Sequence, residues 1–135
     1  MPSIFTRIIN REIPADIIYE DDICITILDV NPVQPWHTLV IPKQELARMD
    51  EYDDATVAHC MIIAKKLMSH MKQVLPDTAF VYLAVEWIEV PHRHIHLIPY
   101  PNNPHDKPRF SRISYEEGQK AEYYRLLKTD LSDNI

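Results

Sequence analysis

One long amphipathic helix pattern, with short strand-like segments on both sides of it, dominates the sequence. From Asp54 to Val74 the apolar residues recur at helical spacing, and lysines occupy the other face. The apolar stripe consists of Val57, Cys60, Met61, Ala64, Leu67, Met68 and Met71. The segment Leu75-Pro76-Asp77 ends the pattern, because proline cannot continue a helix. The sequence therefore predicts a helix over residues 54–74.

The strand-like segments fall into two groups around this helix. Two strands joined by a tight turn, and then a third short strand, precede the helix, whereas a hairpin follows it. The ranges are Ile17 to Leu28 with a turn at Glu20-Asp21-Asp22, Thr38 to Ile41, and Ala79 to Val85 with Val90 to Pro99 around Glu86-Trp87.

Two shorter helical patterns lie near the ends of the sequence. Ile4 to Arg11 has the apolar spacing of a short amphipathic helix, and Pro14 follows it. Ser114 to Leu127 also reads as a helix, which a Ser-x-x-Glu capping pattern from Ser114 to Glu117 would open. Helices and strands do not alternate regularly along the chain. We therefore expect an α+β fold with an antiparallel sheet of about five strands, one long helix and short terminal helices.

Composition restricts the classes of protein to which the chain can belong. With 135 residues, 46% of them hydrophobic and 25% charged, it fits one globular domain over residues 1–135. The net charge of −6 argues against nucleic acid polymers as partners, because phosphate backbones bind clustered Lys and Arg. The sequence shows neither a signal-peptide pattern nor an apolar run near the roughly 20 residues that cross a bilayer. We expect a cytoplasmic protein with no membrane partner, whose Cys24 and Cys60 are small core residues.

Three histidines, His92, His94 and His96, alternate with other residues in one short segment. Alternate side chains of a strand point to the same face, so three imidazoles would line one side while Ile95 and Leu97 face the core. Adjacent imidazoles suit metal binding, and they also suit phosphoryl chemistry, in which one ring attacks and its neighbours hold anionic oxygens. Clustered imidazoles disfavour each other's protonation, which keeps a nucleophilic nitrogen available near neutral pH. The triplet alone leaves both chemistries open, together with a surface strand that is merely rich in histidine.

The segment from Val90 to Pro99 resembles the signature of the histidine triad (HIT) superfamily, in which histidines alternate with hydrophobic residues. Further blocks upstream match the family in the same order. They are Ile4 to Ile9, Glu12 to Ala15, Tyr19 to Asp22, Leu28 to Pro32 and Pro35 to Lys43. The resemblance covers about residues 4–99, so we expect a HIT-like fold with its core there and a variable C-terminal segment over residues 100–135.

The resemblance implies a covalent mechanism at the second histidine of the triplet. His94 would attack the α-phosphorus of a nucleotide and carry the nucleotidyl group until water releases a nucleoside monophosphate. His92 and His96 would orient this nucleophile and contact phosphate oxygens, and His37 would complete the cluster.

The same resemblance implies nucleotide-binding positions. Asp29 falls where the family accepts hydrogen bonds from the ribose hydroxyls, a role suited to a carboxylate that only accepts. Glu89 falls near the phosphate, where the nucleotide-binding branch carries serine. The apolar residues near the base pocket are Ile4, Phe5, Ile8, Ile27 and Val30, and core packing explains them equally well.

Two tryptophans and one arginine depart from the family pattern. Trp36 precedes His37 where the family commonly has glycine or another small residue, and Trp87 replaces a glycine upstream of the triplet. Gly118 is the only glycine, so the other tight turns must be made by Asn, Asp or strained residues. A tryptophan where the family has a glycine at positive φ would cost about 1 kcal/mol. Either Trp36 and Trp87 narrow the pocket entrance, or the turns have relaxed around them. Arg93 is expected on the sheet face opposite the imidazoles.

The resemblance favours a nucleotide hydrolase that acts on nucleoside phosphoramidates or dinucleoside polyphosphates, with a purine nucleotide such as an AMP conjugate as substrate. The alternatives are a nucleotidyl transferase and a nucleotide-binding regulatory protein with weak activity. A metal site is disfavoured because we find no acidic or cysteine ligand close to the triplet. We expect no required cofactor and no protein-bound metal, with a divalent cation only as a substrate counter-ion. The resemblance also implies a homodimer.

Overall fold

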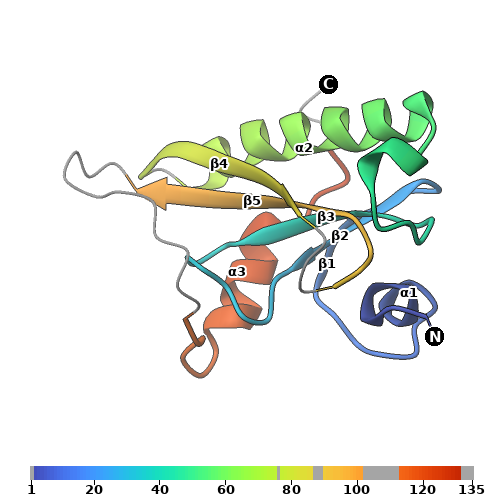
Figure 1. Cartoon of the computed structure of the whole chain (residues 1–135). Coiled ribbons are helices and arrows are strands. Elements are labelled where there is room, and N and C mark those ends of the chain that lie inside the picture. Colours follow the sequence, from blue (N-terminus) through green and yellow to red (C-terminus); the bar gives the residue numbers. More distant parts are fainter. Residues whose placement is uncertain (1, 76, 87–89, 102–112, 132–135) are drawn as a thin grey trace.

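The structure is a computed structural model, and it describes residues 2–75, 77–86, 90–101 and 113–131. Figure 1 shows a twisted sheet with helices packed against it. The elements in chain order are α1 (Ile4–Ile9), β1 (Ile17–Glu20), β2 (Cys24–Leu28), β3 (Thr38–Pro42), a short 3-10 helix η1 (Met49–Glu51), α2 (Asp54–Val74), β4 (Thr78–Glu86), β5 (His94–Pro101) and α3 (Gln119–Leu127). This order confirms the predicted α+β class.

Within the described residues the strands form one five-stranded antiparallel sheet, in the order β1-β2-β3-β5-β4. The sheet order departs from the chain order at one place, because β5 lies between β3 and β4. Leu39 of β3 pairs with His96 of β5, and Val40 pairs with Ile95. The strand that carries the histidines is therefore internal, beside the strand that follows His37.

The histidine strand starts later than the sequence predicted. Strand structure was expected from Val90, but β5 begins at His94. The backbone N–H of His92 donates to the carbonyl of Val90 at 2.7 Å, and that of Arg93 donates to the carbonyl of Leu46 at 2.8 Å. These two bonds hold the chain in a turn ahead of β5, so His92 lies outside the sheet.

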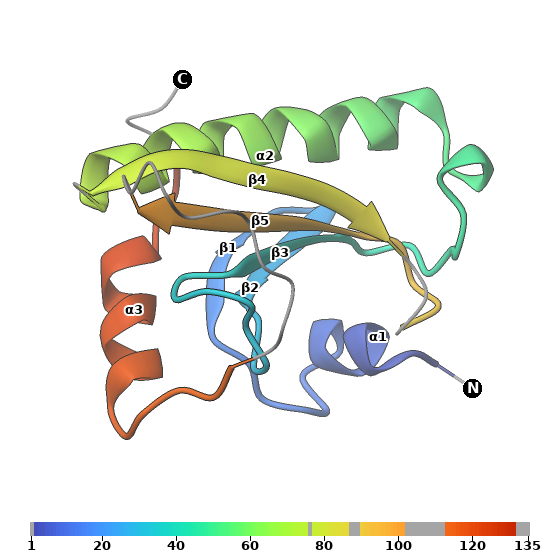
Figure 2. The ribbon, with the colours of Figure 1, turned by 60° about the vertical axis from the view of Figure 1, so that its left-hand side comes forward.

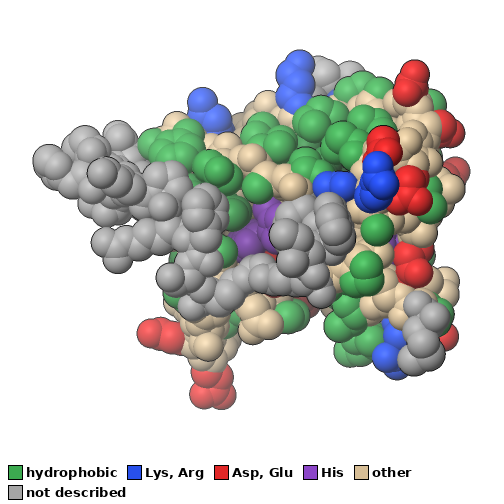
Figure 3. All heavy atoms as spheres, in the orientation of Figure 1, with side chains coloured by type: hydrophobic (Ala, Val, Ile, Leu, Met, Phe, Trp, Pro, Cys, Tyr) green, Lys and Arg blue, Asp and Glu red, His purple; other side chains and the backbone are tan. Residues whose placement is uncertain are grey.

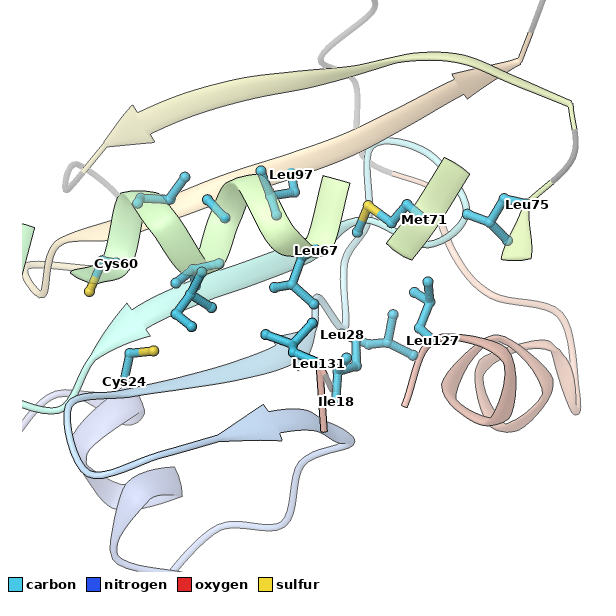
Figure 4. Close-up of a cluster of buried hydrophobic side chains, with 14 residues drawn as sticks. Ile18, Cys24, Leu28, Cys60, Leu67, Met71, Leu75, Leu97, Leu127 and Leu131 are labelled. Carbon is cyan, nitrogen blue, oxygen red and sulfur yellow. The ribbon is translucent and has the colours of Figure 1, made fainter. Parts of the chain in front are cut away.

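Helix α2 spans the predicted residues and covers one face of the sheet (Figure 2). Asp53 caps it by accepting from the backbone N–H of Thr56 at 2.8 Å. Figure 4 shows the core beneath it, where side chains from α2 meet those of the strands and of Leu127 from α3. Both cysteines are free and buried in this core, as predicted. Among the described residues, no helix is both long enough and apolar enough to span a membrane.

Helix α1 packs on the other face of the sheet. Phe5 and Ile8 of α1 contact a second apolar cluster, which includes Ile27 and Leu39 from the strands. The helix ends at Ile9, earlier than predicted, because Arg11 adopts φ 63° and the left-handed backbone cannot continue the helix. The sheet thus has α2 on one face and α1 on the other (Figures 1 and 2).

Helix α3 begins at Gln119 and not at Ser114, so the predicted capping pattern does not open it. Gly118 occupies the N-cap position with φ 83°, in the region that favours glycine. The backbone N–H of Glu116 donates to the side chain of Gln119 at 2.7 Å, which holds the preceding residues in a non-helical turn. The only glycine of the chain therefore sets where this helix starts.

Candidate active site

The alternation of β5 separates a histidine face from a core face. His94 and His96 are exposed by only 2% and 6%, while Ile95 and Leu97 pack into the core under α2. The rings of His94 and His96 lie 4.8 Å apart between centroids. Figure 3 shows histidine side chains at the centre of one face of the molecule. The predicted alternation therefore holds for these two histidines.

His92, the first histidine of the triplet, has both ring nitrogens bonded within the protein. Its Nε2 lies 2.6 Å from the carbonyl oxygen of Pro42, which can only accept, so Nε2 carries the proton. Burial lowers the pKa of His92, so the neutral ring accepts at Nδ1 from the Ser3 hydroxyl, 2.8 Å away. The ring is fully buried. The expected contact between His92 and phosphate oxygens therefore finds no ring nitrogen to make it.

His94 is held in one tautomer by the backbone before it. Its Nδ1 lies 2.7 Å from the carbonyl oxygen of His92, so Nδ1 carries the proton and Nε2 carries the lone pair. The ring of Phe5 meets that of His94 edge-on at 4.8 Å and buttresses it from α1. A neutral imidazole with its lone pair on Nε2 is the form that can attack phosphorus.

His96 is held in the opposite tautomer by a chain of hydrogen bonds from the β2–β3 loop. The backbone N–H of Val33 donates to Nδ1 of His37 at 2.9 Å, so the proton of His37 lies on Nε2. That atom lies 2.7 Å from Nδ1 of His96 and donates to it. The proton of His96 therefore lies on Nε2. The site combines a lone pair on one ring with an N–H donor on the next.

Asp29 lies at the start of the same loop, beside His37. Its Oδ2 is 3.6 Å from Nε2 of His37, and its Oδ1 accepts from the backbone N–H of Asn31 at 2.9 Å. The hydroxyl of Tyr115, which precedes α3, donates to the backbone carbonyl of Asp29 at 3.0 Å. Val33 and Tyr115 were not among the predicted site residues, because one acts through its backbone and the other is distant in sequence.

The residues predicted for the base pocket divide into two environments. Phe5, Ile8 and Ile27 belong to the cluster between α1 and the sheet, and Phe5 joins that cluster to the histidines. In contrast, Ile4 and Val30 are exposed by 48% and 59%. The first group has packing roles whether or not ligand is bound. Glu89 lies outside the described residues.

Trp36 does not narrow the histidine site. Its ring packs against Tyr123 of α3 at 4.6 Å and joins the core on the α2 face of the sheet, away from the histidines. Its φ of 65° is the positive value for which glycine is favoured, as the departure from the family pattern suggested. Trp36 therefore packs on the α2 face, while the next residue, His37, contacts His96. Trp87 lies outside the described residues.

Arg93 also points away from the histidine face. It lines a small cavity of about 20 Å³ on the α2 face together with Tyr52, Cys60 and Ile95. Its Nε is buried and has no hydrogen-bond partner among the described residues. The expectation for Arg93 therefore holds.

Among the described residues, two groups of side chains have donor atoms close enough to hold a metal ion. Asp29, His37 and His96 form one group, and their candidate ligand atoms lie within 4.8 Å of one another. The sequence argument against metal, which found no acidic residue near the triplet, fails here because folding brings Asp29 to it. The second group is Asp21, Cys24 and His59. In both groups, histidine nitrogens that could bind a metal are already hydrogen-bonded to another member of the group. A metal ion would have to displace these hydrogen bonds.

Comparison with known proteins supports the arrangement. Residues 10–103 match the model of the HIT domain family. A HIT-like protein of Borreliella burgdorferi is 32% identical over 139 aligned residues, which cover 98% of this chain and 97% of that protein. A HIT-like protein of Methanocaldococcus jannaschii is 38% identical over 99 residues, covering 71% of this chain and 77% of its own.

Solved structures of histidine triad proteins share the overall fold. A zinc-bound histidine triad family protein from Mycobacterium smegmatis superposes with a TM-score of 0.80 at 27% identity, covering 96% of this chain and 93% of its own. A hypothetical histidine triad nucleotide-binding protein from Sulfolobus tokodaii gives a TM-score of 0.81 at 26% identity, with coverage of 96% and 91%.

Proposed function

Because this chain belongs to the HIT domain family, we propose that it is a nucleotide hydrolase in which His94 becomes transiently nucleotidylated. The substrate is a nucleoside phosphoramidate or a dinucleoside polyphosphate. The observation that carries the proposal is the pair of complementary tautomers, with the lone pair of His94 and the N–H of His96 on neighbouring rings.

In the first step Nε2 of His94 attacks the α-phosphorus. A P–N bond forms, the bond from phosphorus to the leaving group breaks, and its electron pair departs with the leaving group. An amine leaving group takes up a proton from the solvent as it departs. The Nε2–H of His96 donates to the phosphate or to the leaving group, where negative charge develops. In the second step water attacks phosphorus and gives up a proton to the solvent. The P–N bond breaks, its electron pair returns to Nε2 of His94, and a nucleoside monophosphate leaves. Covalent catalysis thus divides one difficult displacement into two easier ones.

We propose that the nucleotide binds to the β2–β3 loop and to α1, which border the histidines. The carboxylate of Asp29 accepts from the ribose hydroxyls, while it also lies 3.6 Å from His37. A purine base is placed against the apolar cluster at Phe5, with the exposed Ile4 and Val30 at its margin. The protein supplies no metal to this reaction, and a divalent cation enters only as a counter-ion of the substrate.

A homodimer is proposed through β4 and the exposed side of α2. β4 is an edge strand of the sheet, so its outer backbone groups can pair with a second copy. Phe80 on β4 and Met61 and Ile62 on α2 are exposed apolar residues. Burial of such residues between two copies would stabilise the dimer. Light scattering on the purified protein tests this arrangement, and a Phe80→Arg variant should be monomeric.

The proposed activity is tested with an adenosine phosphoramidate labelled at the α-phosphate. Wild-type protein should release labelled AMP, whereas His94→Asn should not, because Asn retains a donor toward the His92 carbonyl but lacks the nucleophile. His70→Gln is the matched control, since His70 bonds the Leu127 carbonyl away from the site. Addition of phosphate or a sugar phosphate distinguishes a transferase, which would pass the label to the acceptor. Binding without turnover in the wild type would overturn the proposal and leave a binding protein.

A further inference from the structure

We propose that Ser3 and Glu45 are positioning residues for His94, and that they act through His92 without contact with substrate. The expected effect on kcat rests on the proposed function. The effect on the tautomer of His94 does not, because it is measured in protein without substrate. It assigns His92 to the support of the nucleophile, in place of the phosphate contact expected from the sequence.

The carbonyl of His92 is the link to the reacting ring. It accepts from Nδ1 of His94 at 2.7 Å and so decides which nitrogen of that ring carries the lone pair. A carbonyl in a turn can hold that role only if the turn itself is fixed. The ring of His92 fixes it at two ends, at Pro42 through Nε2 and at Ser3 through Nδ1.

Ser3 has two tasks at the start of α1. Its hydroxyl oxygen accepts from the backbone N–H of Thr6 at 3.2 Å, which caps the helix. The hydroxyl hydrogen goes to Nδ1 of His92 at 2.8 Å. The same side chain therefore caps the start of α1 and binds the Nδ1 that the Pro42 carbonyl leaves unprotonated on His92. Helix α1 also carries Phe5 against His94.

Glu45 holds Ser3 in place from the loop after β3. Its carboxylate accepts from the backbone N–H of Ser3 and from the hydroxyl of Thr6, the latter at 2.6 Å. These hydrogen bonds lower the pKa of Glu45 to about 2, so the carboxylate stays ionised at neutral pH. The nearer oxygen of Glu45 lies 3.9 Å from Nδ1 of His92.

The loop after β3 also hydrogen-bonds to the backbone of Arg93, the residue that follows His92. The carbonyl of Leu46 accepts from the backbone N–H of Arg93 at 2.8 Å. The hydroxyl of Tyr52 fixes Leu46, because it accepts from the N–H of that residue at 3.0 Å and lies 2.8 Å from its carbonyl. The backbone on both sides of the His92 carbonyl is therefore fixed. The His92 ring is bonded to Ser3 and Pro42, and the next residue, Arg93, is bonded to Leu46.

The test compares Ser3→Ala and Glu45→Gln with conservative replacements, Ser3→Thr and Glu45→Asp. Nitrogen-15 NMR of the histidine rings reports the tautomer of His94 in protein without substrate. We expect one Nδ1–H tautomer in the wild type and in Ser3→Thr, and a mixture in Ser3→Ala and Glu45→Gln. In turnover of the labelled phosphoramidate, the last two variants should lose at least about tenfold in kcat, with KM changed by less than about threefold.

Asp53→Ala is the matched control for loss of a helix cap. Asp53 caps α2 as Ser3 caps α1, but within the part of the chain that the structure describes it makes no hydrogen bond to the histidine segment. This variant should lose thermal stability while keeping the His94 tautomer and kcat of the wild type. The proposal is overturned if Ser3→Ala and Glu45→Gln retain the wild-type tautomer, whether or not the protein hydrolyses the substrate. A tautomer change in a protein without turnover would instead overturn the proposed function alone.

Discussion

Nε2 of His37 lies 2.7 Å from Nδ1 of His96, although the two residues are far apart in the sequence. This contact forms because β3 and β5 are neighbours in the sheet and His37 stands just before β3. It fixes the proton of His96 on the nitrogen farther from His37. The orientation of His96 is thus set by His37, which lies in the loop that precedes β3.

Replacement of His37 tests this contact. His37→Ala removes the donor to His96 and should lower kcat by about tenfold to a hundredfold, because the N–H on His96 is no longer fixed. His37→Gln can still place an amide N–H near His96 and should retain more of the activity. Steady-state kinetics on the labelled phosphoramidate measure both. Equal kcat in the wild type and His37→Ala would contradict the assigned role.

Replacement of Trp36 should lower the stability of the fold and leave nucleotide binding unchanged. Trp36→Gly relieves a positive φ worth about 1 kcal/mol, but it also removes the packing on Tyr123, for which large-to-small core changes cost about 3 kcal/mol. The variant should therefore be less stable by about 2 kcal/mol in urea unfolding. Nucleotide affinity should stay within about twofold, because the ring lies on the opposite face of the sheet. A large loss of nucleotide affinity would show that Trp36 contributes to the binding site.

Asp21 ties the β1–β2 turn to α2 and predicts a pH dependence of stability. Burial opposes its ionisation, but hydrogen bonds from the N–H groups of Cys24 and Ile23, from Tyr19 and from His59 lower its pKa from 3.8 to about 2. A carboxyl with a lowered folded-state pKa contributes stability above its unfolded pKa and loses it as the pH falls through the folded value.

The contribution of Asp21 should therefore be complete above about pH 4 and disappear toward pH 2. Asp21→Asn should reduce the free energy of unfolding by about 1–2 kcal/mol at pH 7. The difference between the two proteins should shrink across that acidic window. Urea unfolding at several pH values measures it, and a difference that is constant down to pH 2 would show that the charge of Asp21 is not the cause.

Metal ions should inhibit this protein and not activate it. A zinc ion bound by Asp29, His37 and His96 would displace the bond that orients His96, so micromolar zinc should lower kcat and a chelator should restore it. Turnover after extensive chelation should equal that of untreated protein. Asp29→Asn should weaken the inhibition. Loss of activity on chelation, with recovery on addition of zinc, would instead indicate a catalytic metal.

Periodicity and the family resemblance predicted much of the fold. Helix α2 was predicted over its observed range, because its apolar stripe and the following Leu-Pro-Asp are strong local signals. The alternation of His94 and His96 with apolar residues also held, and the resemblance to the HIT family is confirmed. The start of α3 was wrong, because Gly118 at a positive φ outweighed the Ser114 capping pattern.

The sequence could not predict contacts that depend on the turn ahead of β5. His92 shares the spacing of the other two histidines, yet its backbone bond to Val90 and the contacts with Ser3 and Pro42 take it out of the strand. Of the two alternatives left open for Trp36, a place at the pocket entrance is wrong, because the ring packs on Tyr123, which is distant in the sequence. Such contacts follow from tertiary packing, which one sequence does not record.

The most direct test of the account is rapid acid-free quenching of the wild-type protein during turnover of the α-labelled phosphoramidate, followed by peptide mapping. We predict acid-labile label on His94 alone, at a level that rises before steady-state release of AMP, and none on His94→Asn. Label on a different residue, or AMP release by His94→Asn at the wild-type rate, would contradict the central claim that His94 is the covalent nucleophile.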